Sequence, residues 1–251
     1  MTYRFYRNIH SKALDNFVVS VKETDLWIGV KPYRSGMEKF VLDLVKALRS
    51  DLETYIIKNP NFMTSLVPVE FDENAPNIVK EMMKAGKQAM VGPMAAVAGA
   101  IAQEIGFRLL KAYQPDDVII ENGGDIFLSA KHSLDVAIYA GNSPLSMKLA
   151  LEIPFEFLPC GVCTSSGTVG HSLSFGKADA VVVGHKNAAI ADAFATKLAN
   201  RVKVKADIQD VLRLCKKYDL LSVAVVKNDA FGLAGHFKVK PILLYVKQNI
   251  E

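Results

Sequence analysis

The sequence predicts an α+β fold in which helices pack on one face of an antiparallel sheet. Segments with strand character come in groups, and each group is followed by helical segments. Strands and helices do not alternate one by one, as they would in a βαβ repeat. No Gly-x-Gly-x-x-Gly segment follows a predicted strand, which disfavours a Rossmann domain.

The chain is long enough to bury a full hydrophobic core. It has 251 residues, of which 50% are hydrophobic and 22% charged. We expect one domain over residues 1–251, or two lobes of about 1–115 and 116–251. The net charge is +4, but lysine and arginine are scattered, so we expect no nucleic-acid partner.

Neither a secretory signal nor a membrane span is predicted. Residues 1–16 contain four charged side chains and no apolar stretch. The most apolar window, residues 89–102, is shorter than the ~18 residues of a span and is interrupted by Gly and Pro. We therefore expect a cytoplasmic protein without membrane contact.

The first third predicts a hairpin and then a long helix. Residues 16–24 and 26–31 alternate apolar and polar side chains, with a turn near Thr24. Ser35 is the expected N-cap, with Glu38 completing a capping box before helical residues 40–56. Asn59-Pro60 ends this helix, and residues 65–71 are expected to be extended.

Two further helices are expected at residues 74–86 and 93–113. Pro93 suits a first helical position. The first turns of the second helix carry small side chains, namely Ala95, Ala96, Ala98, Gly99, Ala100 and Ala102. Close packing explains this face best. The alternative is a ligand near the helix N-terminus, where free N–H groups favour anions.

The middle of the chain predicts strands at residues 117–121, 126–130, 134–140 and 147–153. Gly123 and Gly124 interrupt the first pair, which indicates a bulge or the close approach of a ligand or backbone. Asp125 beside them is a candidate cap, turn former or hydroxyl-binding carboxylate. The low, odd number of cysteines argues against a disulfide framework, and Cys160 and Cys163 are interpreted as ordinary thiols.

Residues 164–196 are the stretch with the most candidate chemistry. Its loop supplies hydroxyl and backbone groups for phosphate or ribose, although an ordinary turn is the commoner explanation; the loop residues are Thr164, Ser165, Ser166 and Gly167. His171 is either a proton carrier or phosphate donor, or a structural histidine. A buried strand at residues 180–183 leads into a helix carrying Asp192 and Thr196.

Asp192 and Thr196 are four residues apart, so their oxygens share one side of the helix. Such hard oxygen ligands suit Mg²⁺ or Ca²⁺. The alternatives are a solvated aspartate and a threonine bonded to its own helix backbone. The remaining segments predict a helix at 208–218, a strand at 220–227, a loop at 228–235 and a strand at 237–246.

Four of these segments together resemble the ApbE family, flavin transferases that use FAD and Mg²⁺ to attach FMN to a protein threonine. Residues 95–104 are similar to the family's Lys-Gly-x-Ala-x-Asp helix, and residues 121–125 (ENGGD) to its Asn-x-Gly-Gly-Asp segment. Residues 164–167 with His171 resemble its Thr-Ser-Gly loop and histidine. Residues 191–196 (ADAFAT) resemble its Ala-Asp-Ala-x-x-Thr metal motif.

The resemblance implies a T-fold-related architecture of two ββαα-like halves. It implies FAD bound at Gly123, Gly124, Asp125 and the 164–167 loop, Mg²⁺ on Asp192 and Thr196, catalytic roles for His171 and Asp192, and a protein acceptor. Ala98 stands where the family carries lysine, and residues 172–176 differ from its Asp-Pro segment. These departures motivate the alternative of a non-catalytic protein binding a nucleotide or small metabolite. A homo-oligomeric scaffold that packs through the Ala/Gly helix is a third hypothesis.

Overall fold

The computed structural model describes residues 14–167 and 176–242. Its centre is an eight-stranded sheet in the order β1-β2-β3-β4-β7-β8-β9-β10, with every neighbouring pair antiparallel. The strands are β1 (Asp15–Val21), β2 (Thr24–Lys31), β3 (Asp117–Asn122), β4 (Asp125–Ser129), β7 (Cys160–Ser165), β8 (Ala180–His185), β9 (Ser222–Lys227) and β10 (Ala230–Gly235).

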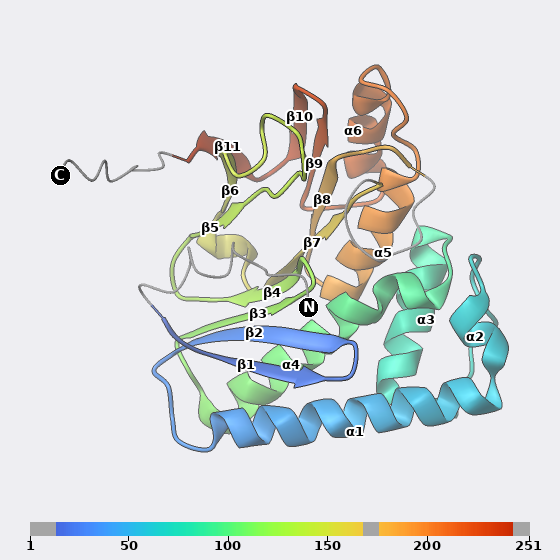
Figure 1. Cartoon of the computed structure of the whole chain (residues 1–251), viewed down its shortest axis with the longest axis vertical. Coiled ribbons are helices and arrows are strands. Elements are labelled where there is room, and N and C mark those ends of the chain that lie inside the picture. The colour runs from blue at the N-terminus through green and yellow to red at the C-terminus, as the bar shows by residue number, and fades with distance from the viewer. Residues whose placement is uncertain (1–13, 168–175, 243–251) are drawn as a thin grey trace.

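The main sheet follows chain order, and all the helices are inserted between strands that are neighbours in it. Between β2 and β3 lie α1 (Met37–Lys58), α2 (Pro60–Thr64), α3 (Asn77–Ala89), a 3₁₀ turn (Pro93–Ala96) and α4 (Val97–Tyr113). Between β8 and β9 lie α5 (Ala188–Ala199) and α6 (Asp207–Lys217). The helices gather on one side of the sheet, with α1 running beneath β1 and β2 (Figure 1).

A second, three-stranded antiparallel sheet covers part of the opposite face. It consists of β5 (Leu134–Ala137), β6 (Leu149–Ile153) and β11 (Lys238–Pro241), in the order β11-β6-β5 (Figure 1). The central strands are therefore buried on both faces, which explains the unbroken apolar run in β8. Val181 and Val183 belong to the helix-side core, whereas Ala180 and Val182 belong to the core under the small sheet.

The fold class predicted from sequence is confirmed: this is an α+β structure with helices on one face of an antiparallel sheet. The small sheet is an addition, because the sequence predicted its strands but not their separation from the main sheet. The two cysteines of β7 lie in different cores, with Cys163 facing the helices and Cys160 facing the small sheet. All three cysteines are free and buried, as expected for ordinary thiols.

Several local predictions are wrong. Ser35 is not the N-cap of α1; Gly36 holds that position at φ 91°, and no side chain caps the helix. Residues 65–71 form no strand. The predicted loop at 228–235 contains β10, which pairs with β9 across a turn at Asn228 and Asp229.

A helix that crosses a membrane must be both long and apolar. None of the described helices alone is long and apolar enough to cross a membrane. Taken together, α3 and Pro93–Tyr113 have the length and apolar composition of a span, but the two parts are bent by 103° relative to each other.

Candidate functional site

The candidate site is built where α4 and α5 pack against each other. Gly99 lies in the first turn of α4, and a Cβ there would stand 2.3 Å from the carbonyl oxygen of Ala188 at the start of α5. Only glycine permits this approach. Close packing therefore explains the small side chains at this point of α4.

The two helices cap each other. Asp192 Oδ2 accepts a hydrogen bond from the Gly99 amide, 2.9 Å away and 93 positions distant in the chain. In return, Gln103 Oε1 of α4 accepts one from the Ala188 amide at 2.6 Å. Each acceptor satisfies an N–H group that the other helix cannot satisfy internally. Asp192 is buried, so the interpretation of this residue as a solvated surface aspartate is wrong.

Gly123 and Gly124 form a two-residue hairpin turn between β3 and β4. Of the two explanations predicted for them, the bulge is therefore wrong, and the close approach of a ligand or backbone stays a prediction. Asn122 pairs with Asp125, and both glycines have positive φ, 71° and 106°. These angles are typical of a type I′ turn, which glycine adopts without strain. The Glu121 carboxylate accepts a hydrogen bond from the Gly124 amide at 2.7 Å, which fixes the turn.

Side-chain contacts hold this hairpin against α4 and β7. Asn122 Nδ2 donates to the carbonyl oxygen of Ala98, 3.2 Å away on α4. Asp125 Oδ1 accepts from the Thr164 amide at 3.2 Å, near the end of β7. The Gly-Gly turn, the end of β7 and the start of α4 are thus brought together with Asp192.

Asp125 and Asp192 make this a buried site with two interacting carboxylates. Each residue is only 8% exposed. Burial raises the pKa of Asp192 to about 7, although the Gly99 and Ala98 amides oppose the shift. Burial, followed by the charge of Asp192, raises the pKa of Asp125 well above its usual range. Within residues 14–167 and 176–242, neither carboxylate forms an ion pair with a lysine or arginine.

Comparison with known proteins places the chain in a family. The family described as AbpE bacteria matches residues 7–228. The chain belongs to this family. The ApbE-like chain is also similar to UPF0280 protein MJ1526 of Methanocaldococcus jannaschii, at 41% identity over 86% of this chain and 89% of the relative. A UPF0280 protein of Methanobrevibacter smithii is 37% identical over 86% and 92% of the two chains.

Solved structures of the ApbE type share the fold. The flavinyl transferase ApbE of Pseudomonas stutzeri superposes with a TM-score of 0.58 at 13% identity, over 88% of this chain and 94% of that one. The ApbE protein of Thermotoga maritima also gives 0.58, at 10% identity over 88% and 97%. These likenesses confirm the ApbE-like fold that the four sequence segments predicted.

The hydroxyl-rich segment is partly strand in this ApbE-like chain. Thr164 and Ser165 belong to β7, and only Ser166 and Gly167 follow it. Ser166 Oγ and the Gly167 amide both lie within hydrogen-bonding distance of the Ala178 carbonyl oxygen, at 3.3 and 2.9 Å. Two of the four residues predicted for the loop therefore belong to the strand.

Two further residues were predicted for the site, Thr196 and His171, and the structure describes only the first of them. Thr196 is half-buried on α5, one turn beyond Asp192. His171 lies outside the described residues. Sequence reasoning missed Gln103, Asn122 and the role of Glu121, because their partners are backbone groups that only the fold brings near them.

The oxygen ligands of this site fit a hard cation better than zinc. Among the described residues, no group of three or more histidine, cysteine or acidic side chains is arranged to hold a metal ion. Asp125 and Asp192 offer two carboxylates that no basic side chain of residues 14–167 or 176–242 neutralises. Such a pair is stabilised by a proton or by a cation, and Mg²⁺ commonly takes only one or two protein carboxylates.

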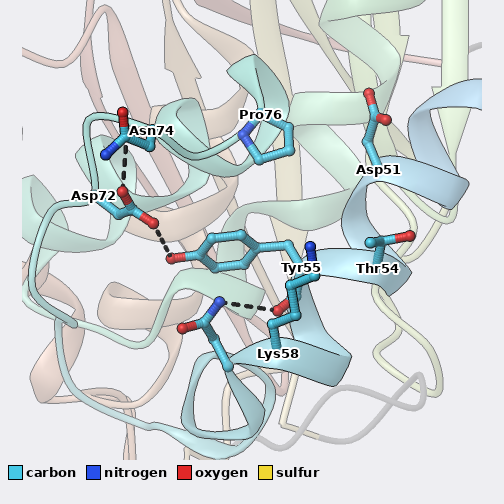
Figure 2. Close-up of a pocket in the computed structure, with 8 residues that line it drawn as sticks. Asp51, Thr54, Tyr55, Lys58, Asp72, Asn74 and Pro76 are labelled. Carbon is cyan, nitrogen blue, oxygen red and sulfur yellow. Dashed lines mark hydrogen bonds between the residues drawn. The ribbon is translucent and has the colours of Figure 1, made fainter.

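A separate hollow lies at the end of α1. It has a volume of about 360 Å³ and is open to solvent (Figure 2). The Tyr55 hydroxyl donates to Asp72 Oδ2 at 3.1 Å across it, and the Asn74 amide donates to Asp72 Oδ1 at 2.9 Å. None of the candidate site residues lines this hollow.

Proposed function

We propose that this ApbE-like protein binds a flavin nucleotide, FAD by analogy, together with Mg²⁺, at the junction of the β3–β4 turn, β7, α4 and α5. The buried carboxylates Asp125 and Asp192, which have no ion pair among the described residues, carry the proposal. A dinucleotide would lie against the Gly123-Gly124 turn and the segment from Thr164 to Gly167. Support for the flavin comes from the family and from its structural neighbours, which include flavin transferases.

Asp192 and Thr196 are the proposed metal ligands, and Asp125 adds a second carboxylate nearby. When bound, the metal would supply positive charge next to the ligand's pyrophosphate. The reciprocal capping of α4 and α5 would hold Asp192 in place, since its Oδ2 is fixed by the Gly99 amide. The Ala98 amide also stabilises the charged form of this carboxylate.

The Gly-Gly turn would provide a surface without side chains beside the ligand. Gly123 is exposed and Gly124 is half-buried, whereas the flanking Asn122 and Asp125 are buried. A nucleotide could thus approach the backbone of the turn directly. His171 is the proposed proton carrier or phosphate donor, and a protein threonine or another acceptor would receive FMN if the chain is a transferase.

The test is Mg²⁺-dependent release of AMP from FAD, with FAD binding measured in parallel by calorimetry. Asp192→Asn keeps an oxygen for the Gly99 amide but removes the charge, so we expect loss of Mg²⁺-dependent binding and turnover in a folded protein. Asp15→Asn, an exposed change on β1, is the matched control. Retention of Mg²⁺-dependent turnover by Asp192→Asn would refute the metal assignment.

A non-catalytic binding role is the second candidate. Ala98, which takes the place of the family's lysine, uses its carbonyl oxygen to anchor Asn122 and brings no charge to the site. FAD binding without AMP release in the wild-type protein would support this role.

A further inference from the structure

Three basic side chains converge on one tyrosine at the C-terminal ends of α5 and α6. The Lys197 ammonium lies 4.3 Å from the centre of the Tyr218 ring, and the Lys217 ammonium 5.6 Å from it. Arg201, just after α5, is close enough to act electrostatically on the same phenol. The ring itself is held by Phe194, with centroids 4.9 Å apart. We name Lys197, Arg201 and Lys217 around Tyr218 the cationic cluster.

No described acidic side chain pairs with the cationic cluster. In the part of the chain that the structure describes, Lys197, Arg201 and Lys217 form no ion pair, whereas several other surface lysines do. Asp219 is the nearest acidic residue in sequence and is exposed, but it makes no ion pair with the cluster. Three positive charges therefore gather around one tyrosine, and no described acidic side chain pairs with them.

The positive charges of the cluster lower the pKa of the Tyr218 hydroxyl. A hydrogen bond from Lys197 is the largest cause that lowers the pKa of its hydroxyl, and the charges of Lys197, Lys217 and Arg201 act in the same direction. Positive charges that stabilise a phenolate relative to water also stabilise an external anion.

The cluster is separate from the carboxylate site. Phe194, which packs on Tyr218, is two residues from Asp192, so their side chains project about 200° apart around α5. Asp192 faces α4, and the cluster occupies the other side of α5. Any ligand of the cluster is thus distinct from the metal proposed at Asp192.

We propose that the cationic cluster is a binding site for a phosphoryl group. Lysine ammonium groups act as point charges for phosphate, and arginine adds planar N–H donors. Lys197 covers a face of the Tyr218 ring, which leaves that face unavailable for stacking a base. Charge and hydrogen bonding, and not base stacking, would therefore recognise the ligand.

Helix-end stabilisation is the competing explanation. Lys197 and Lys217 lie in the last turns of their helices, where positive charge is favourable. Lys87 lies in the last turn of α3 and is exposed, but it takes part in none of the ring contacts of the cluster. It provides a matched control for charge at a helix end.

The experiment is calorimetric titration of the whole protein with inorganic phosphate, without Mg²⁺ and at constant ionic strength. We expect one saturable site, weakened about tenfold in Lys197→Gln and in Lys217→Gln, because each removes one charge-assisted hydrogen bond. Lys87→Gln should bind like wild type. Circular dichroism verifies that every variant is folded.

Absence of saturable phosphate binding in the wild-type protein would overturn the proposal. Equal weakening by Lys87→Gln would do so as well, because it would show diffuse attraction to a basic surface. FAD binding in Lys217→Gln separates the two proposals: we expect it to be unchanged, since Lys217 is remote from the carboxylate site.

Discussion

Removing the charge of Asp192 should stabilise the metal-free protein at alkaline pH. The pKa of Asp192 rises from 3.8 to about 7 on folding, with burial as the largest cause. A group whose pKa is higher in the folded state contributes stability below its unfolded pKa. That contribution is lost as the pH rises through the folded value.

The size of the effect follows from the shift. A change of about 3 pKa units corresponds to about 4 kcal/mol between the two extremes of pH. Between pH 5 and pH 8 the wild-type free energy of unfolding should fall by about 3 kcal/mol from this group alone. Asp192→Asn cannot ionise, and its weaker cap on the Gly99 amide costs about 1 kcal/mol. The variant should therefore exceed wild type by about 3 kcal/mol at pH 8.

The assay is urea denaturation in EDTA at pH 5 and pH 8, followed by circular dichroism. Asp15→Asn serves as the control, because Asp15 is exposed on β1 and should leave the pH profile unchanged. Addition of Mg²⁺ at pH 8 should raise the free energy of unfolding of the wild-type protein and leave that of Asp192→Asn unchanged. An Asp192→Asn protein that is less stable than wild type at pH 8 would refute the reasoning, because the charge would then stabilise the fold.

Three further outcomes are expected. Gln103→Leu should lower the free energy of unfolding by about 2 kcal/mol in urea titrations, because the Ala188 amide loses its acceptor, whereas Gln103→Glu should cost less. Gly124→Ala should lower thermal stability by about 2 kcal/mol because φ is 106°, while Gly123→Asn, at 71°, should stay within about 0.5 kcal/mol of wild type; equal losses would contradict the turn geometry. The buried thiols should resist Ellman's reagent in the native protein at pH 8 and react in urea, since burial raises the pKa of Cys160 to about 12 and that of Cys163 well above its usual range; reaction in the native state would contradict their burial.

Local sequence patterns were sufficient for most of the fold. The apolar run of β8 and the small-residue composition of α5 have one straightforward interpretation each, and both elements are found as expected. Strand β10 was missed because Asn228, Asp229 and two glycines within residues 228–235 are typical of a loop, although only Asn228 and Asp229 form the turn before the strand.

The candidate site was only half predictable, for a physical reason. Its residue types could be read from the sequence, but their partners lie far along the chain. The bond between Asp192 and Gly99 joins positions 93 apart, and that between Gln103 and Ala188 joins positions 85 apart. A local pattern contains no information on such contacts. The Gly-Gly turn was misread because a bulge and a tight turn need the same residues.

The insertion of α1–α4 between neighbouring strands sets the order in which the protein can fold. Strands β7 to β10 pair with near neighbours in the chain, apart from the α5–α6 excursion, whereas β2 reaches β3 only across residues 32–116. Closing so long a loop costs entropy before any pairing is gained. We expect the C-terminal strands to form early and β2–β3 pairing late. The mutual caps between α4 and α5 then mark completion of the fold, so a chain arrested before that step would have no carboxylate pair to offer a metal.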